Sequence, residues 1–410
     1  MPLALLLLPA CGGADDTATG DAPALPPLQL APLQAQLDAL AAQRRPAPDD
    51  ATLRELQEYA DVALQLVDSD ARTAALCERS LLAHERCDAV LVPALTHERP
   101  AVRARAAWLL GRAGRPLAQF ALLLRLKDET AQDPALWIAD ALHRLGNDSA
   151  LGWIDAALFA EQAQQAAGGI AVELLREDGA ALSEQPTWDE LHQALVARMD
   201  AWRATGRGCR DDATAPDPAL VEPIVAAHLA VVQGTQLRPV DEARFVLTRS
   251  GVLALPLLRR ALTAEEPYLR TMALQVLADL GPAARDCAGA VLPLLADPLT
   301  ASYALRALGE LGDPAMAPHL RARLSSLDTE QRAAAAGALG VLGDAASRPR
   351  LRALLQDATE VLDVRVQAAF ALRFLGDDAE AEAFLGEREA KGDYHAPTLA
   401  KLRDRLAARR

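Results

Sequence analysis

The residues best suited to binding chemistry are six arginines in the C-terminal half of the chain. Three of them each follow a proline by three residues, and the other three lie within two positions of these. The six are Arg259, Arg260, Arg321, Arg323, Arg350 and Arg352. On packed helices about 10 Å apart they would form a basic row that suits an acidic peptide or an acidic protein surface. The alternative is a solvated face whose arginines are neutralised by nearby Asp and Glu.

The histidines and cysteines give no ligand set for a metal. His84-Glu85 and His97-Glu98 lie 13 residues apart, and no second set could complete a two-metal site, so we interpret both as solvated helix ends. No cysteine pair has zinc-ligand spacing. The sequence also lacks a nucleophile elbow, a phosphate-binding loop and a His-Glu-x-x-His motif. We therefore predict no catalytic residue, no metal and no cofactor.

A repeat must position the arginines, and it is clearest between residues 241 and 378. Four glycines end apolar runs at spacings of 31, 31 and 33 residues, each with Ala eight before it, Leu four before it and Leu one before it. They are Gly281, Gly312, Gly343 and Gly376. Positions −8, −4 and −1 share one face of a helix, and Gly suits a left-handed cap. A period of this length indicates a solenoid.

The same register extends towards the N-terminus. Further landmark glycines are Gly114, Gly146, Gly179 and Gly251, and His84 takes the equivalent position 30 residues before Gly114. A second apolar run follows most landmarks, often with an early proline, which suits a first helical turn. We therefore predict an all-α protein, an α-solenoid of stacked antiparallel helix pairs over residues 71–378. Arginines eleven residues before a landmark glycine are predicted to hold neighbouring turns; they are Arg103, Arg270, Arg332 and Arg365.

Two stretches carry a family resemblance. Gly312-Asp-Pro-Ala-Met-Ala-Pro-His-Leu and Val364-Arg-Val-Gln-Ala-Ala-Phe-Ala-Leu-Arg-Phe-Leu-Gly-Asp resemble the short HEAT-like repeat, the type also found in phycobilisome lyases. The resemblance implies that second helices line a concave face, where the six arginines would lie. It leaves two classes of function open: a scaffold that binds a protein, or an enzyme accessory similar to the lyases that attach bilin chromophores.

Composition excludes some partners. The 410 residues carry a formal net charge of −14 and a pI near 5.0. Nucleic acid requires a basic face, so we predict no nucleic-acid partner. No internal segment has the roughly 18 unbroken apolar residues of a membrane span.

The N-terminus resembles a bacterial lipoprotein signal. Residues 1–10 are apolar and precede Cys11, and residues 11–27 are rich in Gly, Ala, Asp, Thr and Pro. The resemblance implies removal of residues 1–10, acylation of Cys11 and a flexible tether over 11–27. Gly12 favours the outer over the inner membrane, with the chain facing the periplasm. The alternative is a cytosolic interaction regulator whose N-terminus is merely apolar.

The remaining segments are predicted from the same pattern. Residues 28–70 form an N-terminal helical cap, with helices over 28–45 and 51–67, and residues 379–410 form a C-terminal cap. The array has an enlarged turn at 206–217 and a smaller one at 282–289. Cys209 and Cys287 each lie in one of these turns, so an exported protein could join them by a disulfide. We predict a non-catalytic scaffold, anchored to the membrane by lipid alone and binding a protein partner through its concave face.

Overall fold

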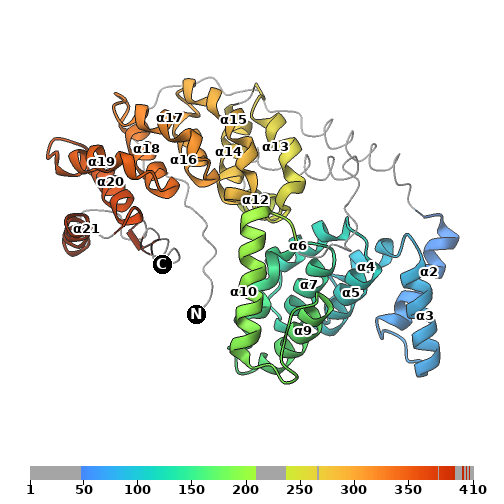
Figure 1. Cartoon of the computed structure of the whole chain (residues 1–410). Coiled ribbons are helices and arrows are strands. Elements are labelled where there is room, and N and C mark those ends of the chain that lie inside the picture. The colour runs from blue at the N-terminus through green and yellow to red at the C-terminus, as the bar shows by residue number, and fades with distance from the viewer. Residues whose placement is uncertain are drawn as a thin grey trace.

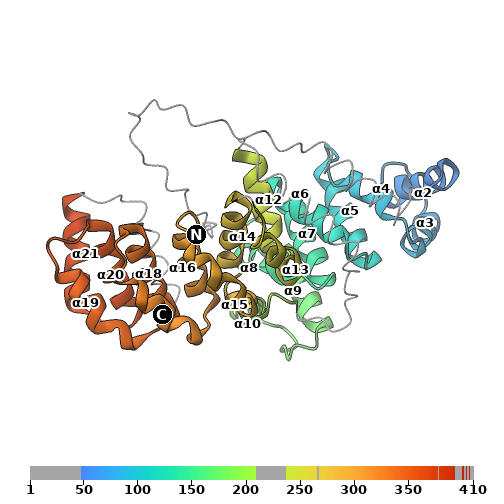
Figure 2. The same cartoon turned by 90° about the horizontal axis from the view of Figure 1, so that it is seen from above.

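The computed structural model describes residues 48–208, 237–265, 267–376, 378–392, 399, 400, 403 and 406. Within these ranges the chain is helical and contains no strand. The predicted signal (1–10), tether (11–27) and first cap helix (28–45) lie outside them, as does Cys11. Helix pairs follow one another in an elongated array from α2 at one end to α21 at the other, with α10 near the middle (Figures 1 and 2). The predicted α-solenoid is confirmed.

The N-terminal stack precedes residue 209 and the C-terminal stack follows residue 236. Elements of the N-terminal stack are α2 (Asp50–Ala63), α3 (Ala71–Ala83), α4 (Asp88–Ala94), α5 (Pro100–Ala113), α6 (Ala118–Asp128), α7 (Gln132–Arg144), η1 (Asp148–Ala150), α8 (Leu151–Leu158), α9 (Gln164–Glu177) and α10 (Trp188–Thr205). Elements of the C-terminal stack are α12 (Leu237–Arg249), η2 (Gly251–Ala254), α13 (Leu255–Ala261), α14 (Pro267–Leu280), η3 (Gly281–Cys287), α15 (Ala288–Val291), η4 (Leu292–Ala296), α16 (Ala301–Leu311), η5 (Pro314–Met316), α17 (Ala317–Arg323), α18 (Thr329–Leu342), η6 (Ala345–Ser347), α19 (Arg348–Gln356), α20 (Leu362–Phe374) and α21 (Ala379–Lys391).

The landmark glycines turn the chain between the helices of each pair. All eight have positive φ, between +56° and +82° except for Gly376 at +142°. His84, which takes the same register position, has φ −78° and ends α3 in an extended conformation instead. The left-handed turns predicted from the glycines are confirmed. The short second helices α13, α17 and α19 each carry proline in their first turn, as expected.

The first helices stack along one another and form most of the core. α5 packs along α7, and α14, α16, α18 and α20 pack in series. In this series the Ala and Leu eight and four residues before each glycine are buried. The leucine directly before the glycine is buried at Leu280 and Leu311 but only half-buried at Leu342 and Leu375. Stability therefore comes from neighbour-to-neighbour burial rather than from one central core.

The four arginines that precede a landmark glycine by eleven residues tie each repeat to its neighbour. In three of them Nη1 donates to two backbone carbonyl oxygens of the preceding loop, and Nη2 donates to a carboxylate 26–28 residues further along the chain. In Arg103 and Arg332 Nε donates to the same carboxylate. These pairs are Arg103–Glu129, Arg270–Asp297 and Arg332–Glu360. Arg365 donates to the carbonyl oxygen of Leu355 and stacks on Phe384. Their predicted structural role is confirmed.

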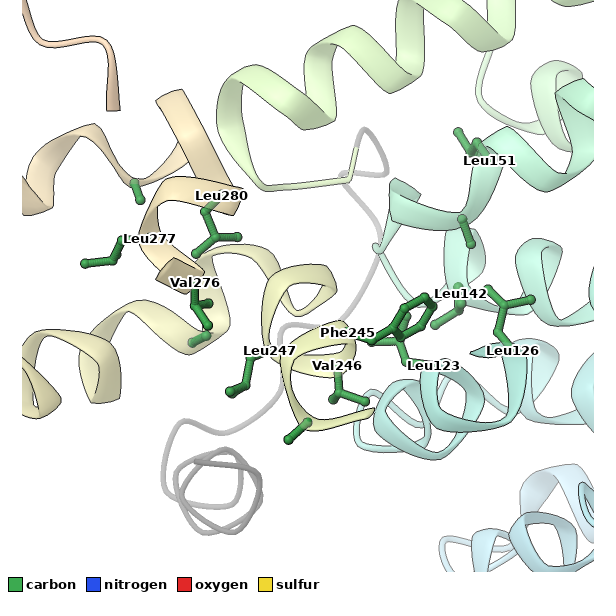
Figure 3. Close-up of a cluster of buried hydrophobic side chains, with 14 of the residues drawn as sticks. Leu123, Leu126, Leu142, Leu151, Phe245, Val246, Leu247, Val276, Leu277 and Leu280 are labelled. Atoms are coloured by element: carbon green, nitrogen blue, oxygen red, sulfur yellow. The ribbon is translucent and has the colours of Figure 1, made fainter. Parts of the chain in front are cut away.

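The two stacks meet at α12. This helix packs against α6 and α14, while α9 and α10 form a pair beside α8. Figure 3 shows Phe245 and Val246 of α12 facing Leu123 of α6 and Leu142 of α7, with Leu247 on the side towards α14. All five side chains are buried, so the junction is a continuous apolar contact.

Backbone hydrogen bonds complete this junction. The amide of Gly208 donates to the carbonyl oxygen of Gly146 at 3.1 Å, and that of Val252 to the carbonyl oxygen of Gly206 at 3.3 Å. A Cβ added to Gly251 would lie 2.2 Å from the Gly206 oxygen, so no side chain fits there. Residues 206–208 therefore link the turns of two distant landmark glycines. The rest of the predicted enlarged turn, residues 209–217, lies outside the described ranges.

The N-terminal cap differs from the prediction in one boundary. α2 ends at Ala63, four residues before the predicted end at Val67, because Gln65 adopts φ +58° and breaks the helix. Asp70 then caps α3 by accepting from the amides of Arg72 and Thr73. No helix within the described ranges combines the length and the apolarity that spanning a bilayer requires.

Candidate functional site

The six candidate arginines lie on three second helices of the C-terminal stack. Arg259 and Arg260 belong to α13, Arg321 and Arg323 to α17, and Arg350 and Arg352 to α19. Four are exposed, whereas Arg321 and Arg323 are half-buried. We call this set the basic row. Arg259, Arg321 and Arg352 occupy the same position of their helices, three residues after the proline; whether a partner binds at the row stays a prediction.

Three members of the basic row reach the turn of the next repeat. Arg321 donates through Nη1 to both carboxylate oxygens of Asp344 at 2.8 Å, and Arg352 through Nη2 to Asp378 at 2.6 Å. Asp344 follows the landmark Gly343, and Asp378 caps α21. At the position where the η3 turn is longer, Arg259 donates through Nε to Sγ of Cys287 at 3.3 Å. The two ion pairs therefore hold neighbouring repeats together, whereas Arg259 makes only a single 3.3 Å contact with a sulfur atom.

Two further members, Arg323 and Arg350, make no ion pair with the described residues of the next repeat. Arg323 donates through Nη2 to the carbonyl oxygen of Leu295 at 2.9 Å, which connects α17 to the preceding repeat. Arg350 reaches only 3.4 Å from the Ser325 hydroxyl, and its side chain extends into solvent. The row thus presents exposed guanidinium groups between carboxylates.

Acidic neighbours set the electrostatics of the row. Burial alone would raise the pKa of Asp378, but the Ala381 amide and the Arg352 guanidinium hold it below its ordinary value. Glu380 lies 3.9 Å from Nε of Arg352. The arginine side chains in these pairs nevertheless remain 38% exposed at Arg321 and 47% at Arg352. Both guanidinium groups therefore remain accessible to solvent although each is paired.

The predicted cysteine chemistry rests largely outside the described ranges. Cys287 is buried and carries a free thiol in the structure. Its predicted disulfide partner, Cys209, is not among the described residues, so the bond stays a prediction, as does acylation of Cys11.

The histidine of each His-Glu pair stabilises a local turn. Nδ1 of His84 accepts from the amide of Arg86, and Nδ1 of His97 accepts from the amide of Arg99, both at 3.1 Å. Nδ1 of each histidine is therefore bound by the backbone amide two residues later, as in a local turn at a helix end. Across the part of the chain that the structure describes, no group of His, Cys, Asp and Glu side chains is arranged to hold a metal ion.

A buried charged cluster was missed by the sequence analysis. His143 is fully buried, with Nδ1 2.6 Å from Asp148 Oδ1 and Nε2 3.0 Å from Asp178 Oδ2. Burial alone would lower the pKa of His143, but the two carboxylates outweigh it and raise the pKa to about 9. Nε of Arg198 lies 3.6 Å from Asp178. A usable signal was present: His143 and Asp178 lie three and one residues before landmark glycines, at positions otherwise small or apolar in several units.

Comparison with known proteins agrees with this architecture. Residues 290–373 match the family described as HEAT repeats. No curated protein matches the chain.

Solved structures with similar helix arrangements are only distantly related. An engineered protein is 19% identical, with 86% of this chain and 97% of that chain covered and a TM-score of 0.28. Human deoxyhypusine hydroxylase is 18% identical, with coverage of 79% and 98% and a TM-score of 0.22. The karyopherin Kap121p is 14% identical, with coverage of 88% and 47% and a TM-score of 0.32, so the chain spans under half its length. The stacked helix pairs make the described chain an α-solenoid, and residues 290–373 within it match HEAT repeats.

Proposed function

We propose that this protein is a non-catalytic scaffold that binds a protein partner on the face formed by α13, α17 and α19. The observation that carries the proposal is the basic row, in which exposed or half-buried arginines recur on three second helices of an otherwise acidic molecule. The partner would present an acidic surface, whose carboxylates pair with the exposed guanidinium groups. Many shallow contacts along a preformed surface bind with little ordering cost.

The test reverses charge where the row contributes least to the fold. Arg259 and Arg350 are exposed and bond to neutral side chains at 3.3 and 3.4 Å, so the double variant Arg259→Glu, Arg350→Glu should fold with an almost unchanged Tm. It should recover at least tenfold less of the partner that the unchanged protein captures from its native host. The matched control is Arg79→Glu with Lys391→Glu, which makes the same charge change at exposed sites outside the row. Equal recovery by both variants would reject the basic row as the binding surface.

We also propose that Cys11 carries the lipid that holds this scaffold on the periplasmic side of the outer membrane. The support is the apolar run of residues 1–10 directly before Cys11 and the polar segment after it. Metabolic labelling with a fatty acid should mark the full chain and not a Cys11→Ser variant, and globomycin should cause the uncleaved form to accumulate. An unlabelled protein in the cytosolic fraction would favour the cytosolic regulator and leave the scaffold proposal untouched.

A further inference from the structure

Arg249 stands out because its half-buried guanidinium group has no anionic partner within the described ranges. It lies in the last turn of α12, with its guanidinium carbon 4.0 Å from the ring centre of Phe245 and 5.5 Å from that of Trp153. Nε is buried and has no hydrogen-bond acceptor. Within the described ranges, no carboxylate or carbonyl oxygen pairs with its side chain.

The equivalent arginines of other repeats are paired. Arg249 precedes its landmark glycine by two residues, as do Arg112 and Arg144 in the N-terminal stack. Arg112 lies over the Trp108 ring and pairs with Glu173 at 2.8 Å. Arg144 pairs with three carboxylates, which are Asp140, Glu173 and Glu177. In both of these repeats the arginine at this register position is paired with a carboxylate.

The nearest candidate acid in the C-terminal stack is already engaged. Asp279 of α14 accepts from Nε and Nη2 of Arg244 at 2.7 and 2.9 Å, and its charge only partly compensates Arg249. Burial lowers the pKa of Arg249 to about 10, so the group still carries its proton at neutral pH. Nε is enclosed while the residue as a whole is half-buried, so the unpaired cation is partly desolvated and can still be reached by an anion.

The backbone around Arg249 is fixed at the junction of the two stacks. Nδ2 of Asn147 donates to the carbonyl oxygen of Arg249 at 2.9 Å and to Oε1 of Gln119 at 3.1 Å, and both polar side chains are buried. Phe245 is buried and Trp153 is half-buried, so apolar ring surface borders the guanidinium group. A ligand there would meet a rigid cationic fork set in an aromatic environment.

We propose that Arg249 anchors a binding site for a monocarboxylate with an aromatic or apolar body. A carboxylate matches the free edge of the guanidinium group with two parallel hydrogen bonds. One negative charge neutralises the one unpaired positive charge, whereas a dianion such as phosphate would leave an excess negative charge close to Asp279. The ring surfaces of Phe245 and Trp153 would cover the apolar body of the ligand.

The test uses benzoate as the probe, with benzamide as its neutral isostere, at constant ionic strength on the full chain. Benzoate at millimolar concentration should raise Tm by about 2 °C or more, and benzamide should not. Arg249→Met should abolish this shift. Arg112→Met, which removes a paired arginine from the same register position, should keep it. Inorganic phosphate serves as a further arm and should give a smaller shift than benzoate.

Three outcomes would overturn the proposal. Benzoate could leave Tm unchanged, it could act equally on the Arg249→Met variant, or phosphate could stabilise the protein as well as benzoate does. If Arg249→Met fails to fold, Arg249→Lys takes its place. Lysine keeps the charge but loses the planar fork, so the benzoate shift should fall by at least half. An undiminished shift in Arg249→Lys would also reject Arg249 as the anchor.

Discussion

Arg332 donates through Nε and Nη2 to the two carboxylate oxygens of Glu360, at 2.9 and 2.6 Å. Nη1 of the same side chain donates to the carbonyl oxygens of Ser326 and Leu327. One guanidinium group thus fixes the loop before α18 and the loop before α20. Because both side chains are largely buried, the pair links two repeats through a water-poor contact, where a fork of parallel hydrogen bonds is strongest.

We expect Arg332→Gln to destabilise the C-terminal stack by about 2–3 kcal/mol, because Glu360 and two carbonyl oxygens lose their donors together. Urea denaturation measures the change. The control is Arg203→Gln, which breaks the pair with Asp200, a pair whose side chains are 64% and 61% exposed. That change should cost about 0–0.5 kcal/mol. Similar losses in the two variants would contradict a structural role for Arg332.

His143 predicts a loss of stability in alkali. Its pKa is raised from an ordinary value of 6.5 to about 9 in the folded chain, so its contribution is fully present below pH 6.5 and is lost as pH rises through 9. The size of the shift corresponds to about 3 kcal/mol. The urea midpoint, measured from pH 6 to 10, should therefore fall between pH 6.5 and 9. The fall should be larger than in a variant that lacks the histidine.

Two histidine variants test whether the buried His143 causes this alkaline loss of stability, with the half-buried His192 as the control. His143→Gln should flatten the alkaline fall and lower stability by about 3–5 kcal/mol at neutral pH, since Asp148 and Asp178 lose the cation between them. His192→Gln should keep the alkaline fall. The His192 ring is 33% exposed, and its Nδ1 contacts only Asp155 at 2.7 Å among the acidic groups of the described ranges. A steep fall that persists in His143→Gln would show that another group titrates.

Glu129 predicts a loss of stability at low pH. Burial alone would raise the pKa of this carboxyl, but hydrogen bonds from Arg103, from the Ala131 amide and from Arg125 lower it from 4.5 to about 2. Its contribution is present above pH 4.5 and is lost as pH falls through 2. Glu129→Gln should therefore cost about 2 kcal/mol at pH 7 and much less at pH 2.5, measured by urea denaturation at both values. An equal loss at both pH values would mean that shape rather than charge matters at this position.

Most of the correct predictions about the fold came from the spacing of residues within a single repeat. The turn at Gly343 and the helix before it depend on residues within about ten positions, so their spacing was enough. The bond from Arg332 to the next repeat was predicted in kind, because the register places it beside the following loop. The end of α2 was missed because a single residue, Gln65, adopts a left-handed conformation that its type does not indicate.

Features that depend on distant segments could not be predicted in the same way. α12 packs against α6, although more than a hundred residues separate them, and no local pattern indicates that pairing. Three arginines of the basic row could be placed at one helix position from their spacing to proline, but the pairing of Arg321 with Asp344 depends on the rotation between repeats. The isolation of Arg249 is a property of what surrounds it in space, which sequence spacing does not report.

The closeness of the first helices gives the last prediction. A Cβ added to Gly340 would lie 2.4 Å from Cα of Ala371, so Gly340→Ala must push α18 and α20 apart. We expect a loss of about 1–3 kcal/mol from overpacking, although alanine is the better helix former. Gly386 of α21 has no atom within 4 Å of an added Cβ, and Gly386→Ala should stabilise the protein by about 0.5–1 kcal/mol. Gly337 lies between these cases, because its added Cβ would meet only the movable end of Gln367. Thermal and urea denaturation of the three variants should order them as Gly386→Ala, Gly337→Ala and Gly340→Ala from most to least stable, and a Gly340→Ala variant as stable as the parent would show that the helices have room to spare.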